Sequence, residues 1–473
     1  MSRCCWLLLV ALCHMTSSTN PGVKIRLTES GIEYGRQLGL AFIQRKLKSA
    51  TVPDISGSHR ASIFGHVEYY LSKMHLQSVE LPQLAVVLMP ATGVRLSFGN
   101  AFIGMKGNWR YNYRSILWDS GSFDLNMNKL AVHTSVAVTS LQTGRPQVAS
   151  VNCAATVGSV DIKFQGRASW LYNLFRSIIS KYLRSWLQKQ ICNLVADAVS
   201  DLNPRLKMLT VSAKVDKYAE IEYSMVSAPT VLDSSIGLSL KGIFYNIQSH
   251  QEPLFSAAIF SLPPKNNRMV YIGVSAFTAN SAALVYNTAG ALSLHITDDM
   301  VPKSSPIRLN TKAFGFFIPQ IAKLSPSLMM KLLVKTVKNP VITMEPNNVT
   351  VQATSTVTAY AIQPNRRLSP LFVLNLEASV SAQVFVSGTK LAAAVTLNKL
   401  NLTLGTSYVG DFQVRPLDNI LKMVLYLLVQ PKLNGKLAKG YPLPTIGKMK
   451  LANTELHVLK DYFLIGTDVE CIE

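Results

Sequence analysis

Residues 168–207 read ASWLYNLFRSIISKYLRSWLQKQICNLVADAVSDLNPRLK. Neither Gly nor Pro interrupts this stretch before Pro204, so it can form a helix of about 30 residues, some 45 Å long. Its apolar residues make two stripes, and at about 100° per residue the second lies roughly half a turn around the axis from the first. A helix that wraps along a strongly twisted sheet needs this shift, although an ordinary core helix is the alternative interpretation. The first stripe comprises Leu171, Leu174, Phe175, Ile178 and Tyr182, and the second comprises Leu187, Ile191, Leu194, Val195 and Ala198.

The chain before this helix predicts a shorter helix followed by many strands. Residues 31–48 form the expected helix, and its basic end suits a helix C-terminus. Apolar residues alternate with period two through much of residues 63–164, which is typical of strands. The alternation slips at Lys129, which indicates a bulge or a turn. The basic residues at the end of the shorter helix are Arg45, Lys46 and Lys48.

The second half of the chain repeats this order of elements. Residues 227–235 have the composition of a linker, strand patterns recur between residues 236 and 404, and a short helical piece spans about 314–324. A second long helical segment spans about 416–439. The two long helices end in related sequences, LNPRL and LNGKL, whose asparagines Asn203 and Asn434 lie 231 residues apart. The repeated order and the repeated signature predict an internal duplication.

The first 19 residues predict a secretory signal peptide. Arg3 is its positive region, WLLLVALC at 6–13 is its apolar core, and Ser17 and Thr19 are the small residues before a cut at Asn20. The apolar run is too short to span a bilayer. We therefore expect a soluble protein that is secreted or stored in granules.

Three of the six cysteines remain after this cut. An oxidising compartment favours a disulfide, and Cys153–Cys192 is the better pair because it ties the strands before the long helix to the helix itself. Cys471 is then the odd thiol, either free or bridged to a second chain. Two sequons, at Asn348 and Asn401, fit a secreted glycoprotein.

The chain is both apolar and basic, with a mean hydropathy of +0.21 and a net charge of +21. Residues 20–200 carry a net charge of +11 and the longer remainder carries +9, so the charge density is higher in the first part. This balance indicates an anionic partner such as phosphate, anionic lipid or glycosaminoglycan. Nucleic acid suits a secreted apolar chain poorly, and we expect no such partner.

The sequence offers little support for catalysis. It contains no GxSxG, HExxH or GxxxxGK[ST] motif, and the seven histidines after residue 19 are scattered without metal-ligand spacing. Asp298 and Asp299 form an isolated acidic pair, which fits a turn or a strand end better than an acid/base dyad. We expect neither an enzyme nor a metal site.

Lipid binding is better supported. Long amphipathic helices beside twisted sheets can enclose an elongated apolar cavity, and such a cavity suits acyl chains because apolar burial at ~25 cal/mol per Å² needs no hydrogen-bond partners. A solid core is the alternative.

A basic and aromatic stretch, KGNWRYNYR at 106–114, gives a second lipid signal. Gly107 and Asn108 indicate a turn, and a hairpin tip there places cations beside Trp109, an arrangement favoured where polar headgroups meet acyl chains. A solvated hairpin without a partner is the alternative. The cations of this stretch are Lys106, Arg110 and Arg114.

Several longer motifs carry a family resemblance. They are NPGV at 20–23, the Cys153 and Cys192 pair, RMVYIGVS at 268–275, LVYNTAG at 284–290, DDMVPK at 298–303 and KGYPLP at 439–444. Through these motifs the chain is similar over its whole length to the family of bactericidal permeability-increasing protein and lipopolysaccharide-binding protein. The resemblance implies an α+β boomerang of two pseudo-symmetric domains, each a barrel of strongly twisted antiparallel sheet with a long helix, joined by a central sheet.

The resemblance also implies sites and a domain plan. Each domain should hold one phospholipid in an apolar pocket, and a basic tip of the N-terminal domain should bind the phosphates of lipid A. We expect an N-terminal lipid- and lipopolysaccharide-binding domain at 20–226, a linker at 227–235 and a C-terminal barrel domain at 236–473. No catalytic cofactor is expected.

The implied function is that of a secreted innate-immunity protein that binds lipopolysaccharide and acts on the anionic surface of Gram-negative bacteria or neutralises endotoxin. Delivery of lipopolysaccharide to a host receptor and transfer of plasma phospholipid are the alternatives. Family members tend to carry a nearly continuous basic run after the Trp, whereas residues 111–113 here are Tyr, Asn and Tyr. More positive charge is added to this tip if other basic residues lie at the same end of the domain. These residues are Lys163, Arg167 and the basic end of the first helix. The expected lipopolysaccharide-binding residues are Arg45, Lys46, Lys48, Lys106, Trp109, Arg110 and Arg114.

Overall fold

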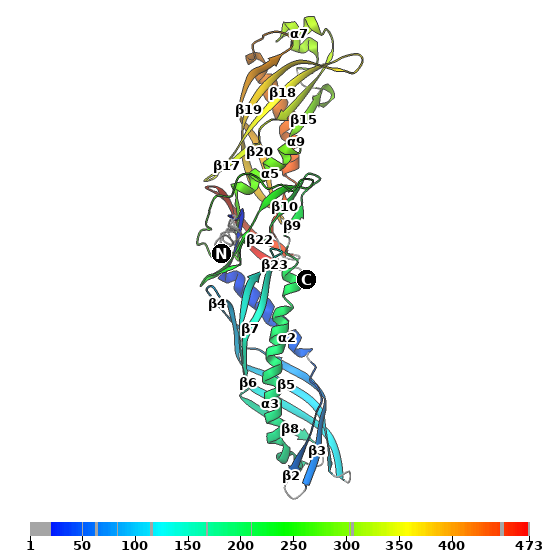
Figure 1. The fold of residues 1–473 in the computed structure, drawn as a ribbon, viewed down its shortest axis with the longest axis vertical. Coiled ribbons are helices and arrows are strands. Elements are labelled where there is room, and N and C mark those ends of the chain that lie inside the picture. The colour runs from blue at the N-terminus through cyan, green and yellow to red at the C-terminus, as the bar shows by residue number, and fades with distance from the viewer. Residues whose placement is uncertain are drawn as a thin grey trace, which may run out of the picture.

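The computed structural model describes residues 20–49, 51–61, 65–82, 84–113, 117–166, 169–209, 211–301, 303, 307–444 and 449–471. Within these ranges no helix is both long and apolar enough to cross a membrane. The predicted signal peptide lies outside them. Two halves lie end to end in one elongated molecule, with strands β22 (Met449–Leu459) and β23 (Tyr462–Cys471) between them (Figure 1).

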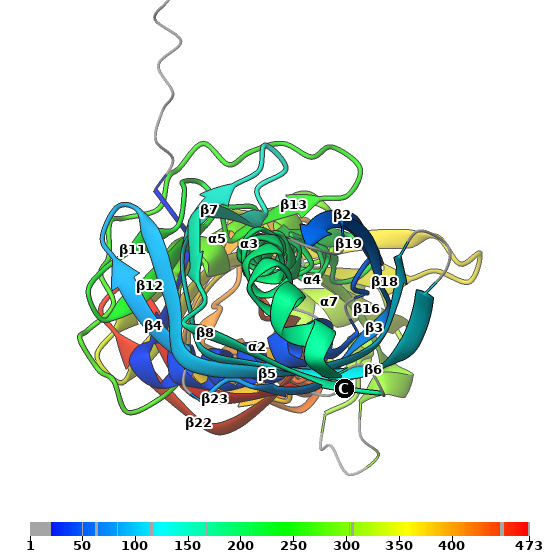
Figure 2. The ribbon, with the colours of Figure 1, turned by 90° about the horizontal axis from the view of Figure 1, so that it is seen from below.

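A seven-stranded antiparallel sheet forms the N-terminal half. Its strands curve around the helix α3 (Ser169–Ser200), as Figure 2 shows along the long axis, and α2 (Glu29–Lys48) also packs against it. Alternation along the strands sends every second side chain into the core between sheet and helices. The strands are β2 (Ile55–Ala61), β3 (Gly65–Glu80), β5 (Gly93–Tyr113), β6 (Leu117–Ser140) and β7 (Pro146–Thr156) in that order, with β4 (Leu84–Met89) beside β5 and β8 (Ser159–Gln165) beside β6.

The buried stripe of α3 winds around the helix. A step of four residues turns a helix by about 400°, so a stripe at this spacing drifts by roughly 40° per step and by nearly half a turn over four steps. Between Ile179 and Val195 the buried stripe therefore drifts around the helix. Tyr182, which the sequence assigned to the first stripe, is 47% exposed, and its neighbour Leu183 is buried instead. Most side chains of the first predicted stripe lie outside the described part of the chain. The stripe comprises Ile179, Leu183, Leu187, Ile191 and Val195.

The predicted disulfide and the predicted bulge are both present. Cys192 of α3 is bonded to Cys153 of β7, with the two Cα atoms 5.7 Å apart. In the pairing of β5 with β6, the register shifts beside Lys129, whose φ is 55°. Between the Ala101 and Ile103 pairs β6 has one residue more than β5, as in a β-bulge.

A six-stranded sheet joins the halves, in the order β11-β12-β1-β14-β23-β22. Residues 227–235, predicted to be a linker, contain a short strand of this sheet, the edge strand β11 (Thr230–Val231). The N-terminal strand β1 (Val23–Thr28) lies between β12 (Ser235–Leu240) and β14 (Val270–Ser275). The sequence boundaries therefore cut through a shared sheet, and a cut after residue 226 leaves β1 without either neighbour. A separate three-stranded sheet holds β9 (Ser212–Lys214), β10 (Ala219–Glu222) and β13 (Ile243–Asn246).

The C-terminal half has a second seven-stranded sheet, crossed by a helical run from Arg415 to Leu437. This run confirms the second long helix and consists of η3 (Arg415–Leu417), α8 (Asp418–Val424), a π-helical turn η4 (Leu425–Val429) and α9 (Gln430–Leu437). The predicted helical piece near 314–324 is two short helices, α6 (Thr311–Gly315) and α7 (Pro319–Leu324). The helix α5 (Ala276–Thr288) was not predicted. The strands are β15 (Ser293–Thr297), β16 (Met329–Thr336), β17 (Val341–Glu345), β18 (Asn348–Ile362), β19 (Leu368–Ser387), β20 (Lys390–Ser407) and β21 (Tyr441–Pro442).

The two repeated asparagines make equivalent hydrogen bonds in the two halves. The side-chain amide of Asn203 accepts a hydrogen bond from the backbone N–H of Val148 and donates one to its carbonyl, both at 2.9 Å. The amide of Asn434 makes the same pair of bonds to Val395, at 2.8 and 3.1 Å. Each long helix is thus tied to one strand of its sheet by an equivalent clamp, which agrees with the predicted duplication.

Candidate functional site

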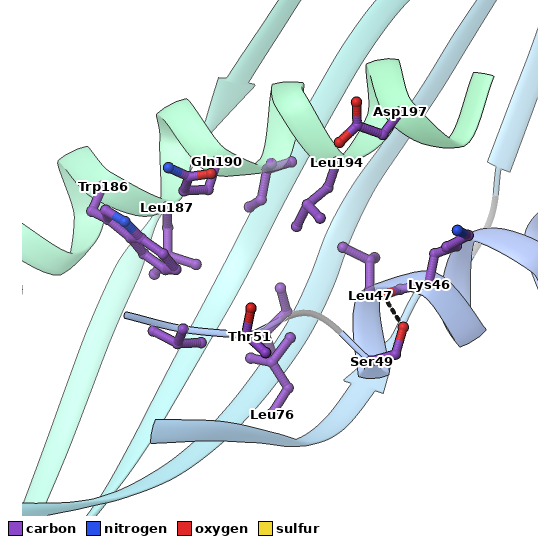
Figure 3. Close-up of a pocket in the computed structure, with 13 residues that line it drawn as sticks. Lys46, Leu47, Ser49, Thr51, Leu76, Trp186, Leu187, Gln190, Leu194 and Asp197 are labelled. Carbon is purple, nitrogen blue, oxygen red and sulfur yellow. Dashed lines mark hydrogen bonds between the residues drawn. The ribbon is translucent and has the colours of Figure 1, made fainter. Parts of the chain in front are cut away.

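A cavity of about 370 Å³ lies between the end of α2 and the second half of α3 (Figure 3). Trp186, Leu187 and Leu194 of α3 point toward Leu47 of α2 and Leu76 of β3 across it. This volume falls within the ~300–1,000 Å³ of ligand sites, and the walls suit an acyl chain. The lining residues are Lys46, Leu47, Ser49, Thr51, Val52, Leu76, Ile103, Trp186, Leu187, Gln190, Ile191, Leu194 and Asp197.

Polar groups gather at the α2 end of this cavity. The Nζ of Lys46 lies 2.5 Å from an Oδ of Asp201, which directly follows α3. Ser49 Oγ donates a hydrogen bond to the backbone oxygen of Lys46 at 3.0 Å (Figure 3). Of the predicted cations, Lys46 lines the cavity and is paired with Asp201, whereas Arg45 and Lys48 are not among the lining residues.

Trp109 does not lie at a turn. The strand β5 continues through Gly107 and Asn108, and Trp109 is 5% exposed within the core of the N-terminal half. Its indole N–H donates to the carbonyls of Ser122 at 3.0 Å and of Gln165 at 3.2 Å. The prediction that this side chain lies at an exposed hairpin tip is wrong, because strand alternation turns residue 109 inward.

Two glycines explain why bulky aromatic rings fit there. Gly121 lies directly opposite Trp109 in the ladder, and a Cβ on it would lie 2.7 Å from the indole nitrogen. A Cβ on Gly107 would lie 2.7 Å from the ring of Phe123. Gly107 thus provides room for a core aromatic ring rather than marking a turn.

Trp118 is an exposed aromatic residue of this region. It is 72% exposed at the start of β6 and lies opposite Asn112 on the outer face of the sheet. Arg110 lies one row away on the same face, with its guanidinium 4.9 Å from the ring centre of Tyr70. Arg60 lies near the end of β2 and is exposed. We call Arg60, Tyr70, Arg110 and Trp118 the outer tip group. The period-two alternation of β6 is the sequence signal that could have placed Trp118 on the outer face.

Acidic residues accompany these cations. Lys106, Asp124 and Lys163 lie directly opposite one another across β5, β6 and β8, and Lys106 Nζ is 3.7 Å from Asp124. Asp124 therefore offsets part of their charge. On the inner face, burial first and the charge of Asp119 second raise the pKa of Tyr111 above its ordinary value, so its phenol stays neutral at physiological pH.

The predicted binding residues fall into two separate clusters. Ile103 of β5 lines the cavity, and Arg110 lies seven residues further along the same strand, or roughly 23 Å at 3.3 Å per residue. The basic end of α2 is thus not part of the outer tip group. Arg114 and Arg167 lie outside the described residues.

The remaining sequence predictions concern isolated residues. Asn348 and Asn401 are both exposed, at the start of β18 and within β20, so either can be reached by a glycosylating enzyme. Asp298 accepts hydrogen bonds from Arg308 and from the backbone N–H of Leu309, which gives it a structural role in a turn. Among the described residues no group of three His, Cys, Asp or Glu side chains can hold a metal ion.

Comparison with known proteins gives matches along the whole chain. The N-terminal domain of the LBP / BPI / CETP family matches residues 31–204, and its C-terminal domain matches residues 213–471. The bactericidal permeability-increasing protein of Sebastes schlegelii is 70% identical over 99% of both chains. The lipopolysaccharide-binding protein of Bos taurus is 34% identical over 98% of this chain and 97% of its own. A crystal structure of lipopolysaccharide binding protein superposes with a TM-score of 0.67 at 30% identity, over 96% of this chain and all of that chain.

Two duplicated domains of twisted antiparallel sheet, each crossed by a long helix, define the class of this protein. The chain belongs to the LBP / BPI / CETP family. The predicted α+β fold of two similar domains around a central sheet is confirmed.

Proposed function

We propose that this protein binds the lipid A part of bacterial lipopolysaccharide at the far end of its N-terminal half, as a secreted protein of innate immunity. In this role it acts on Gram-negative bacteria or neutralises their endotoxin. The observation that carries the proposal is the outer tip group, where guanidinium groups and an exposed indole share one face of the sheet. Relatives named for bactericidal action and for lipopolysaccharide binding support it.

The chemistry of the outer tip group suits a phosphorylated lipid. Arg110 is held over the ring of Tyr70, so its planar fork is presented to solvent, where it can pair with phosphate oxygens. Trp118 offers a large amphipathic ring at the level where headgroups meet acyl chains. Lys106 and Lys163 add long-range attraction, reduced by Asp124.

A bound phospholipid in each domain is a further part of the proposal. In the N-terminal half an acyl chain enters the cavity beside α3, and the headgroup stays near Lys46, Ser49 and Thr51. In the C-terminal half the helical run from Arg415 to Leu437 covers the equivalent position on its own sheet. Secretion through the predicted signal peptide and glycosylation at the two sequons complete the proposal.

Two alternatives predict different ligands or partners. Delivery of lipopolysaccharide to a host receptor uses the same tip but requires a protein partner. Transfer of zwitterionic plasma phospholipid uses the cavity and requires no cations at the tip. The outer tip group favours an anionic ligand over the second alternative.

The test is binding of the full chain to lipopolysaccharide aggregates and to phosphatidylcholine vesicles at two salt concentrations. We expect preferential binding to lipopolysaccharide that weakens at high salt, because the Debye length falls from about 10 Å at 0.1 M to about 3 Å at 1 M. Equal binding to both lipids, without a salt effect, would favour the transfer protein and overturn the proposal.

A further inference from the structure

The far end of the C-terminal half is a second surface, on which large apolar side chains are exposed. Three segments meet there: residues 309–331 with α6 and α7, residues 360–370 with the β18–β19 turn, and residues 405–415, which begin in the last residues of β20. Met329 of the first segment pairs with Ile362 of the second. The side-chain amide of Gln320 in the first segment donates a hydrogen bond to the carbonyl of Asp411 in the third, at 3.4 Å. Figure 1 shows α7 at the extremity of the molecule opposite β2 and β3.

Large apolar side chains project from this end. Phe316, between α6 and α7, is 82% exposed, and Leu324 at the end of α7 is also exposed. Their exposure does not come from loose packing, because the same two helices bury Phe314, Ile318 and Ile321 almost completely. The exposed apolar residues are Phe316, Leu324, Met329, Leu368 and Tyr408.

Cations surround these side chains. The three segments contain six Lys and Arg residues against one acidic residue, Asp411. Lys312, Lys323, Arg366 and Arg367 are exposed, and none of them pairs with a carboxylate within the described residues. At the N-terminal tip, by contrast, the carboxylate of Asp124 lies directly between Lys106 and Lys163.

We propose that this C-terminal end is a docking surface for an anionic lipid bilayer. This end combines single apolar side chains with cations that have no carboxylate partner, and the combination matches the two layers of a membrane surface. The apolar side chains can enter the boundary of the acyl chains, while the cations pair with lipid phosphates. A protein-binding surface differs, because its buried centre is depleted of charged residues. The proposal concerns a surface remote from the outer tip group and does not depend on lipopolysaccharide binding there.

The test uses the full chain with the outer tip group disabled by Arg110→Ala and Trp118→Ala, so that remaining binding reports on other surfaces. Co-sedimentation with phosphatidylcholine vesicles, with and without phosphatidylglycerol, is measured for this parent and for its derivatives. We expect the parent to bind the anionic vesicles. Adding Phe316→Ser and Leu324→Ser should weaken this binding roughly tenfold or more.

A second derivative removes the charge instead of the apolar contact. Lys323→Glu with Arg367→Glu should also weaken binding roughly tenfold or more and should remove the preference for phosphatidylglycerol. Ile259→Ser is the matched control, because Ile259 is likewise 82% exposed but lies in the segment between β13 and β14. It should bind like the parent.

Three results would overturn the proposal. The first is vesicle binding by both derivatives that equals that of the parent. The second is an equal loss in the Ile259→Ser control. The third is concentration-dependent dimerisation of the lipid-free chain that disappears with Phe316→Ser, since the surface would then bind a second copy of the protein.

Discussion

Replacing Trp109 by alanine is expected to destabilise the N-terminal half rather than to remove a lipid contact. The side chain is 5% exposed, stacks on Tyr111 with ring centres 6.0 Å apart and donates to two backbone carbonyls. Truncation of a buried Trp costs about 3–5 kcal/mol through lost burial and the cavity that remains. For a domain of this size each kcal/mol shifts Tm by about 2–4 °C, so thermal unfolding followed by circular dichroism should show a loss of roughly 6–20 °C.

Trp118→Ala is the matched control for this prediction. It is the same chemical change at a side chain that is 72% exposed, and it should alter the free energy of unfolding by less than about 0.5 kcal/mol. In lipopolysaccharide binding the order reverses, because Trp118 belongs to the outer tip group. The reasoning is refuted if the two variants are equally stable and Trp109→Ala is the one that loses affinity.

Three further predictions concern the frame and the cavity. Asn203→Ala and Asn434→Ala should each lower the free energy of unfolding by about 1–3 kcal/mol in denaturant titrations, since each leaves a strand N–H and carbonyl unpaired; a large effect for only one would contradict the equivalence of the two clamps. Replacing Cys153 and Cys192 together by serine should cost about 2–5 kcal/mol, and non-reducing peptide mapping that links either cysteine to another partner would contradict the assignment. Leu194→Trp fills the cavity, so mass spectrometry of organic extracts should recover less phospholipid from this variant than from the parent chain; equal recovery would place the lipid elsewhere.

The frame of the fold could be predicted from the sequence because its signals are periodic and repeated. The drift of the apolar stripe along residues 168–207 predicted a helix on a twisted sheet, and α3 buries a stripe that winds in this way. The repeated Leu-Asn signature predicted a duplication, and Asn203 and Asn434 make the same clamp. Both signals depend on the spacing of residues within one element, and this spacing can be read directly from the sequence.

The tip could not be predicted in the same way, because a glycine in a strand-like sequence can either mark a turn or leave room for a bulky neighbouring side chain. Gly107 beside Asn108 resembles a turn, whereas the structure uses Gly107 and Gly121 to accommodate rings inside the barrel. The direction of Trp109 depends on the register between β5 and its neighbours, which is a tertiary property. The position of Lys46 could not be predicted for a related reason, since it lies beside the cavity and pairs with Asp201, which follows the C-terminal end of α3.

The affinity of the full chain for lipopolysaccharide, measured with Arg110→Ala and Trp118→Ala combined, tests the central claim most directly. Circular dichroism first establishes that the variant is folded, and Lys46→Ala with Lys48→Ala serves as the comparison from the separate cavity cluster. We predict that the tip variant binds roughly tenfold or more weakly and with a smaller salt dependence, because an indole and a phosphate contact are lost together. An unchanged affinity in the tip variant, or an equal loss in the comparison variant, would contradict the assignment of lipopolysaccharide binding to the outer tip group.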